Sequence, residues 1–422
     1  MSAINSFAEY EDAAVFGSVL AELMRQQNQI ELIASENIVS SAVLAAQGSI
    51  FTNKYAGGSP GQRSYAGCEY VDVIEDIALE RAKGLFGCAH VNVQPHSGAQ
   101  ANAAVLAALL EPDDTILGMA FDAGGALTRE AKQTCARFKT AAYGTRDDGR
   151  IDYAEVERIA HQQRPRLIVA GGPALPRQIN FGRFRSIADS VGATLMVDMS
   201  HFAGLVAGDV YPSPFPHAHV VTSTTHKTLR GPRGGIILTN DSELAKKINS
   251  AVIAELQGSP FMHVIAAKAV AFAEALRPSF QTYAKRMIES ARALANALIA
   301  RGFQLVTGGT DTHLVVVDLR GKGVSGEQAE NILQRVGLTC NKNTVPSDHL
   351  SPLQANGIRL GTASGTTRGF GADEFARIGA LIADMLEAAA RFNGGAVDDA
   401  LEKTVRGEVQ ALCKRFPIYE RL

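Results

Sequence analysis

The 422-residue sequence lacks the features that mark several large classes of protein. Its formal net charge is only −2, so it has neither the basic excess of a nucleic-acid-binding protein nor a charge that draws it to an acidic membrane surface. No unbroken apolar run is long enough to cross a bilayer. These absences predict a protein that binds no nucleic acid and no membrane.

Cysteine is also scarce. The five cysteines lie far apart, and none belongs to a CxxC pair or to a spacing typical of a metal site. The N-terminal stretch MSAINSFAEYEDAAVF carries three acidic residues and lacks the basic and apolar regions of a secretory signal. We therefore expect reduced thiols, no bound metal and a cytoplasmic location.

What is present is a regular alternation of strand-like and helix-like segments. Between residues 91 and 240 the apolar runs VNV, TILGM, LIVAGG, TLMVDM, HVVTST and GGIILTN are separated by helical patterns such as EVERIAHQQ. This rhythm predicts an α/β fold with a mainly parallel sheet covered by helices on both faces. At this length more than one domain is expected. We predict an N-terminal helical arm (1–30), a large domain (31–278) and a small C-terminal α+β domain (279–422).

A lysine follows one of these strands. In VVTSTTHKTLRGPRGG, Lys227 comes after an apolar run and hydroxyl residues and precedes a glycine-rich turn. A lysine at the end of a strand can lie desolvated in a cleft, where its amine becomes nucleophilic. Alone, the pattern is more often that of a solvated loop lysine.

Two earlier segments change that balance. In VDMSH, Asp198 ends an apolar strand and His201 follows three residues later, at the edge of the sheet where α/β proteins bind ligands. In PHSGAQAN, Ser97 and Gly98 open a helix whose N-terminus suits a phosphate, although the same pattern is an ordinary helix cap. A phosphate loop, an aspartate and a lysine in this order indicate a site for pyridoxal phosphate, whose protonated ring nitrogen pairs with a carboxylate.

Longer blocks of sequence then resemble the serine hydroxymethyltransferase family, whose members have the fold of type I pyridoxal-phosphate enzymes. From residue 31 to the C-terminus the matching blocks are IELIASEN, FTNKYA, GCEYVD, NVQPHSGAQAN, VDMSHFAGL, TTHKTLRGPRGG, QGSPFMHVIAAKAVAF, NKNTVP and GIRLGT. The resemblance implies that Lys227 holds the cofactor as a Schiff base, that Asp198 pairs with the ring nitrogen and that His201 contacts the phenolic oxygen. It also implies further cofactor-binding residues, namely Ser97, Gly98, Ala99, Thr224 and Ser259, with Tyr55 and Gly258 from a neighbouring subunit.

The substrate side of the site follows from the same resemblance. Ser35 and Arg359 match the residues that grip the substrate carboxylate, a role that suits a planar guanidinium. Tyr65 is expected at the substrate as well. A site completed by a second subunit implies a homodimer or a tetramer acting on a small amino acid.

The departures from the family cluster at the site. The family usually has a glutamate where this chain has Gly57, and that carboxylate transfers a proton during hydroxymethyl transfer to folate; glycine cannot do so. Ser59 and Ser64 replace aromatic residues near folate. The base could then be Tyr65, His226 or an ordered water.

A second group of departures surrounds the expected cofactor. Ala126 replaces the histidine that stacks on the ring, while Ala123 and Arg129 also replace histidines. Pro173 stands in place of a hydroxyl residue, and Ser259 in place of a glycine. Losing the stacked ring leaves room for an α-substituent, and Arg129 would either meet a second anionic group or pair with Glu130. Asn343 and Leu127 still match positions next to folate, so the sequence leaves tetrahydrofolate use open.

These observations favour bond cleavage or formation at Cα of a β-hydroxy-α-amino acid, independent of folate and of the α-methylserine aldolase type. Three alternatives stay open. They are a folate-dependent hydroxymethyltransferase with a remodelled site, a repurposed enzyme that performs β-elimination or decarboxylation, and a non-catalytic regulatory homologue. Retention of Lys227, Asp198, His201 and Arg359 argues against the last.

Overall fold

The computed structural model describes residues 12–120, 125, 138–346, 348, 355–391 and 397–420. The chain divides into two compact units. The large unit is Ala42–Lys285, and the small unit joins Met1–Ser41 to Arg286–Leu422. The division falls within helix α12 (Pro278–Ala300). The domain boundaries predicted from the sequence, after residues 30 and 278, stay predictions.

The large unit is built on a seven-stranded sheet with the order β4-β10-β9-β8-β7-β5-β6. The pairs from β9 to β6 are parallel, while β10 is antiparallel to both β9 and β4. The predicted α/β fold with a mainly parallel sheet is therefore confirmed. The strands are β4 His90–Asn92, β5 Thr115–Met119, β6 Lys139–Tyr143, β7 Leu167–Ala170, β8 Thr194–Asp198, β9 Val220–Thr224 and β10 Gly235–Thr239.

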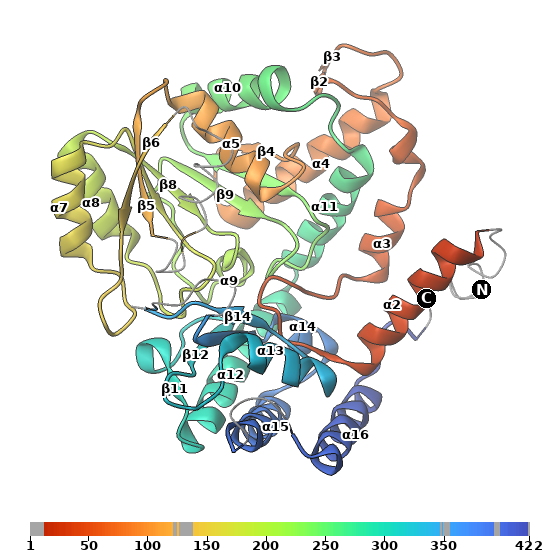
Figure 1. Cartoon of the computed structure of the whole chain (residues 1–422). Coiled ribbons are helices and arrows are strands. Elements are labelled where there is room, and N and C mark those ends of the chain that lie inside the picture. The colour runs from red at the N-terminus through yellow and green to blue at the C-terminus, as the bar shows by residue number, and fades with distance from the viewer. Residues whose placement is uncertain are drawn as a thin grey trace. The chain divides into compact units, whose positions relative to one another are not determined.

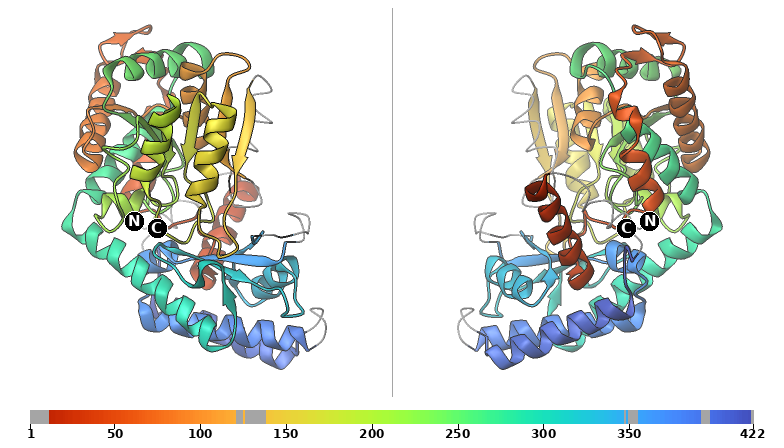
Figure 2. Two further views of the ribbon diagram at one scale, coloured as in Figure 1. Left: turned by 90° about the vertical axis from the view of Figure 1, so that its left-hand side faces the viewer. Right: turned by 90° about the vertical axis from the view of Figure 1, so that its right-hand side faces the viewer.

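Burial on both faces explains why β7, LIVA, is continuously apolar and why β10, GIILT, is nearly so. Every residue of β7, β9 and β10 is buried. On one face Val169, Met196 and Val220 pack with the alanines of α5, and helices α7 and α8 lie side by side elsewhere on the unit (Figure 1, Figure 2). A helix-covered sheet of this kind leaves the carboxyl ends of the parallel strands for ligand binding.

The helices of the large unit follow the expected alternation with strands. They are α3 Ser41–Gln47, η1 Ile50–Asn53, α4 Glu69–Phe86, α5 Gly98–Leu109, α7 Tyr153–Gln163, α8 Phe181–Val191, α9 Ala203–Ala207, α10 Ser242–Ser250, η2 Ala251–Leu256 and α11 Met262–Ala275. A short hairpin, β2 Gly58–Ser59 and β3 Gln62–Arg63, precedes α4.

The small unit combines a four-stranded antiparallel sheet, in the order β11-β12-β15-β14, with a parallel pair of β1 and β13. The strands near HLVVVDL and GIRLGT are confirmed as β12 and β15. Its elements are α2 Ala13–Asn28, β1 Ile30–Glu31, β11 Gln304–Leu305, η3 Val306–Gly308, β12 Leu314–Asp318, α13 Gly326–Arg335, β13 Leu338–Thr339, β14 Asn341–Asn343, β15 Gly357–Gly361, α14 Ala363–Arg368, α15 Ala372–Ala390 and α16 Asp399–Arg415.

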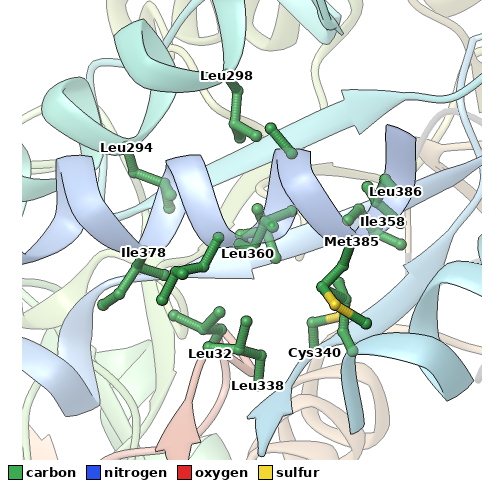
Figure 3. Packing of buried hydrophobic residues seen from close by; sticks show 14 of the residues in the cluster. Leu32, Leu294, Leu298, Leu338, Cys340, Ile358, Leu360, Ile378, Met385 and Leu386 are labelled. Carbon is green, nitrogen blue, oxygen red and sulfur yellow. The ribbon is translucent and has the colours of Figure 1, made fainter. Parts of the chain in front are cut away.

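The core of the small unit joins residues from both ends of the chain. Figure 3 shows Leu294 and Leu298 of α12 and Ile378 of α15 with Leu360 of β15 and Leu32 of the N-terminal segment. All five side chains are almost fully buried. The segment around β1 is thus part of the small unit's core and is held there by apolar packing.

Membrane insertion finds no support in the helices. In the part of the chain that the structure describes, no helix combines the length and the apolar character needed to cross a bilayer.

Candidate active site

A pocket opens at the carboxyl ends of β7, β8 and β9 in the large unit. Its space, counted together with the solvent at its mouth, is about 570 Å³. Seven residues predicted from the sequence lie on its wall. The full lining is Gly98, Ala99, Asn102, Val169, Gly171, Gly172, Pro173, Asp198, Ser200, His201, Thr224 and Lys227.

Two glycines let the backbone close around this pocket. Gly98 needs no side chain because a Cβ there would come within 2.6 Å of the Thr224 Cγ2 atom. Gly171 has a φ of +127°, and its Cβ would lie 2.2 Å from the Asp198 carbonyl oxygen. Any larger residue at either place would push β8 or β9 out of position.

The carboxylate of Asp198 is oriented by two donors. Asn102 Nδ2 donates to Oδ2 at 3.0 Å, and the Ser200 backbone N–H donates to Oδ1 at 2.9 Å. Asn102 is in turn fixed by Thr222 Oγ1, which donates to its Oδ1 at 2.6 Å. Each Asp198 oxygen therefore has a fixed donor, so the carboxylate keeps one orientation in the pocket.

The N-terminus of α5 supplies a place for an anion. Ser97 caps this helix by accepting a bond from the Gln100 N–H at 3.2 Å. Ser97 does not line the pocket, but Gly98 and Ala99 do. The first backbone N–H groups of a 12-residue helix lie at its positive end, which favours a bound phosphate.

Hydrogen bonds on both sides hold the turn that carries Lys227. The Thr225 N–H donates to the Gly234 carbonyl at 3.1 Å, and Thr228 Oγ1 donates to the His201 carbonyl at 3.0 Å. The second bond ties the turn to the segment after Asp198. Lys227 and Asp198 are therefore fixed relative to each other across β8 and β9.

His226 stands next to Lys227 but is largely buried. Burial, followed by the charges of Lys227 and Arg233, lowers the pKa of His226 to about 3. Its Nδ1 atom is buried and has no hydrogen-bond partner within the described residues. The imidazole is neutral at physiological pH.

A second group of predicted residues gathers around the β2–β3 hairpin of the large unit, and none of them lines the pocket. The rings of Tyr55 and Tyr65 lie 4.6 Å apart, and both side chains are about half exposed. Gly57 lies beside them, because its Cβ would be 3.3 Å from Tyr65 Cε2. Ser259 Oγ accepts from the Ala56 N–H at 2.8 Å, and a Cβ on Gly258 would lie 3.2 Å from the Tyr55 hydroxyl.

Ser35 and Arg359 both belong to the small unit. Arg359 lies on β15, where Nη2 donates to Asn341 Oδ1 at 3.1 Å. Burial lowers the pKa of Arg359 to about 10, so the guanidinium keeps its charge at neutral pH. The segment before Ser35 crosses the same strand, since the Gly361 N–H donates to the Leu32 carbonyl at 2.7 Å and a Cβ on Gly361 would lie 2.4 Å from Ala34 Cα.

Several predicted positions lie outside the described residues. They are Ala123, Ala126, Leu127 and Arg129. Their predicted roles stay predictions.

The stability of the chain is expected to depend on pH because the pKa of Glu31, four residues before Ser35, is raised. Burial, reinforced by the Glu36 carboxylate, raises the pKa of Glu31 to about 7, although Arg25 lies 3.7 Å away. The folded chain then binds more protons than the unfolded chain between pH 4.5, the ordinary value, and pH 7, so stability falls as pH rises through this window. We expect Glu31→Gln to be more stable than the parent at pH 8 by roughly 1–3 kcal/mol, with no gain near pH 4.

Urea unfolding at both pH values measures this difference. Glu22→Gln is the matched control, because hydrogen bonds from Arg25 and Gln26 lower the pKa of Glu22 to about 2. The charged Glu22 carboxylate stabilises the folded chain, whereas the charged Glu31 carboxylate destabilises it. Glu22→Gln should therefore lose stability at neutral pH. Equal gains for Glu31→Gln at pH 4 and pH 8 would contradict the assignment.

The pocket fits pyridoxal phosphate by the chemistry of its groups. The N-terminus of α5 suits the phosphate, the fixed carboxylate of Asp198 suits a protonated ring nitrogen, and Lys227 has the amine that reacts with an aldehyde. Gly98 and Gly171 have no side chains that would fill the space between these groups. Sequence reasoning missed Asn102, although a buried amide in an alanine-rich helix is a signal that it needs a polar partner.

Comparison with known proteins agrees with this chemistry. The family model described as serine hydroxymethyltransferase matches residues 8–382. A serine hydroxymethyltransferase of Rhodospirillum centenum (strain ATCC 51521 / SW) is 61% identical over 414 residues, covering 97% of this chain and 96% of that protein. One of Caulobacter sp. (strain K31) is 62% identical over 411 residues, covering 97% and 94%. Serine hydroxymethyltransferase 2 of Burkholderia pseudomallei (strain K96243) is 59% identical over 417 residues, covering 98% of each.

The match extends over nearly the whole chain and includes the pocket, so the resemblance seen in the sequence is confirmed, together with the type I fold, the use of pyridoxal phosphate and an enzymatic role. The chain belongs to the serine hydroxymethyltransferase family.

Proposed function

We propose that this enzyme cleaves or forms the Cα–Cβ bond of a β-hydroxy-α-amino acid without tetrahydrofolate, with an α-methylserine-type amino acid as the concrete substrate. The observation that carries the proposal is Gly57. A Cβ at this position would meet the rings of Tyr65 and Tyr55, and glycine brings no carboxylate to this place. Folate-dependent transfer has no proton carrier at this position.

The pocket residues would hold the cofactor. The N-terminus of α5 would bind the phosphate, Asp198 would pair with the ring nitrogen, and Lys227 would form the covalent bond. When bound, pyridoxal phosphate supplies an electron sink for the pair left at Cα. Asn102 and the Ser200 N–H keep Asp198 in the orientation that this ion pair needs.

Arg359 and Ser35 would fix the substrate carboxylate. A charged, buried guanidinium binds a carboxylate strongly and in one plane. Fixing that group decides which bond at Cα is aligned for cleavage, so orientation selects the reaction.

The chain must also take the proton of the β-hydroxyl as the Cα–Cβ bond breaks. His226 is a poor base because its pKa is about 3. The ring of Tyr65 borders position 57 directly. Because Tyr65 does not line the pocket of its own chain, we assign the proton transfer to Tyr65 of the neighbouring subunit in the shared site, either directly or through a water.

Space for an α-substituent is part of the proposal. Pro173 lines the pocket and brings no hydroxyl to it. The sequence adds Ala126 in place of the stacked histidine, and Arg129 as a cation for a second anionic group.

A folate-dependent serine hydroxymethyltransferase is the second candidate. It is favoured by the relatives of that name, which are about 60% identical over the full chain. β-Elimination or decarboxylation, as in a repurposed enzyme, is the remaining reading within the same cofactor chemistry.

The test incubates the purified holoenzyme with α-methylserine, serine and alanine, each with and without tetrahydrofolate. We expect formaldehyde release from α-methylserine at a rate that tetrahydrofolate does not change. Strong stimulation by tetrahydrofolate with serine would favour the transferase, while pyruvate with ammonia, or carbon dioxide, would favour the repurposed enzyme. The cofactor's visible absorption, recorded in parallel, shows which amino acids bind.

A homodimer with shared sites completes the proposal. Large apolar side chains that flank Tyr55 in the sequence are exposed on the large unit, among them Ile50 at 83% and Tyr70 at 74%. Such exposure is typical of a surface that a second subunit covers. Light scattering after size exclusion distinguishes a monomer, a dimer and a tetramer.

The cytoplasmic location stays a prediction from cysteine usage.

A further inference from the structure

Lys268 is a fully buried lysine in the middle of α11, between two alanines. Only 1% of its surface is exposed. Burying an ammonium is costly unless all of its protons find acceptors. Here Nζ donates to the carbonyls of Val93 at 2.6 Å, Gly235 at 2.8 Å and Pro95 at 3.1 Å, so every proton is used.

The three acceptors come from two segments, one before α5 and one at the start of β10. Val93 and Pro95 belong to the loop between β4 and α5, which leads into Ser97, and Gly235 begins β10. The Gly235 N–H also donates to the Pro95 carbonyl at 3.0 Å. Since the Gly234 carbonyl accepts from Thr225 at the Lys227 turn, the ammonium joins the loop before α5 to the strand that anchors Lys227.

Close packing around this ammonium explains the paired glycines of RGPRGG. A Cβ on Gly234 would lie 2.5 Å from Lys268 Cε and 3.0 Å from its Nζ. A Cβ on Gly235 would lie 2.3 Å from the Ser97 carbonyl oxygen. No side chain fits at Gly234 or Gly235, because Lys268 and the start of α5 occupy that space.

The surrounding charges and hydrogen bonds hold the same loop. Burial lowers the pKa of Lys268 to about 7, and the Glu75 carboxylate opposes this fall. Glu75 accepts from Arg63 at 2.6 Å and from Gln94 at 2.7 Å. On the other side Gln257 accepts from the His96 N–H and donates to the Gln94 carbonyl, both at 3.0 Å.

We propose that Lys268 is a positioning residue for the cofactor, because it fixes the separation between the N-terminus of α5 and the Lys227 turn. The inference rests on the proposed binding mode, in which the phosphate binds at α5 and the aldehyde carbon at Lys227. A ligand of fixed length held at both ends binds tightly only if both anchors are already in place. Lys268 touches neither substrate nor cofactor and acts through the backbone.

The experiment uses the full chain in apo and holo forms. Lys268→Met keeps the length of the side chain and removes the donors. Gly234→Ala keeps the lysine but displaces its flexible end, since the added carbon meets Cε at 2.5 Å. Lys246→Met, at a lysine whose side chain is 72% exposed, is the matched control.

Two quantities are measured for each variant: the dissociation constant of pyridoxal phosphate from apoprotein, by visible absorption, and the melting temperatures of the apo and holo forms. We expect both Lys268→Met and Gly234→Ala to bind the cofactor about 10–100-fold more weakly, by analogy with outer-shell residues of metal sites. The rise in melting temperature on adding cofactor should be smaller in these two variants than in the parent chain. Lys246→Met should match the parent.

A purely structural role predicts a different pattern. Both melting temperatures would then fall together, with an unchanged dissociation constant, and that result overturns the inference. If Lys268→Met does not fold, Gly234→Ala decides by the same two measurements. Failure of the parent chain to bind pyridoxal phosphate would instead overturn the proposed binding mode.

Discussion

Replacing Lys227 with alanine is expected to remove the covalently attached cofactor and to lower kcat by roughly 10³-fold or more. Lys227 follows the end of β9 by three residues and lines the same pocket as the fixed carboxylate of Asp198. The variant should still bind pyridoxal phosphate without a covalent bond, because the α5 N-terminus and Asp198 are unchanged. The visible band of the holoenzyme should shift to that of the free aldehyde.

Borohydride reduction followed by peptide mass analysis measures the covalent bond directly. In the parent chain we expect the reduced cofactor on the peptide that contains Lys227. Lys268 offers an internal control, because its amine is buried and its protons are all accepted by carbonyls. Lys246→Ala, a change at an exposed lysine, should leave the label in place. A label that persists in Lys227→Ala would refute the assignment.

Much of the fold could be predicted because its signals are local. Buried strands are rich in apolar residues, and the six segments that predict strands in the large unit correspond to β4, β5, β7, β8, β9 and β10. The strand β6 was missed because its sequence, KTAAY, begins with two polar residues and only its last residue is buried, at the edge of the sheet. The antiparallel direction of β10 could not be predicted from the local sequence pattern, since the sequence of a strand does not encode its orientation in the sheet.

The grouping of the N-terminal segment with the C-terminal part of the chain could not be predicted either. Ile30 pairs with Leu338 in a two-stranded parallel sheet, and Leu32 packs in the core of the small unit. Contacts across such a separation follow from tertiary packing. They leave no trace in the spacing of residues near Ile30.

The site divides in the same way. Gly98, Asp198 and Lys227 lie at element ends, where the order of strands and helices already points to a shared edge. Asn102 and Lys268 lie inside helices and act through partners far away in sequence, Asp198 and Gly235. Their signal is a polar residue in an apolar helix, which indicates a buried partner without naming it.

Gly57→Glu is expected to restore folate-dependent chemistry, with an increase of roughly 10²–10⁴-fold in tetrahydrofolate-dependent conversion of serine to glycine. The backbone of Gly57 does not have a positive φ, so a side chain is compatible with it. The new Cβ would lie 3.3 Å from Tyr65 Cε2, and Tyr65 is half exposed, so its ring can move by the few tenths of an ångström required. The carboxylate would then return to the position from which the family's proton transfer takes place.

Gly57→Gln separates this proton transfer from a change of shape. Glutamine adds the same number of heavy atoms but cannot accept and return a proton, so it should leave the reaction as slow as in the parent chain. Folate-independent cleavage of α-methylserine should fall in both variants, because each fills space beside Tyr65. Equal rates for the glutamate and glutamine variants with tetrahydrofolate would contradict the prediction. The altered residues Ser59 and Ser64 on the same hairpin, rather than the missing carboxylate alone, would then account for the loss of folate chemistry.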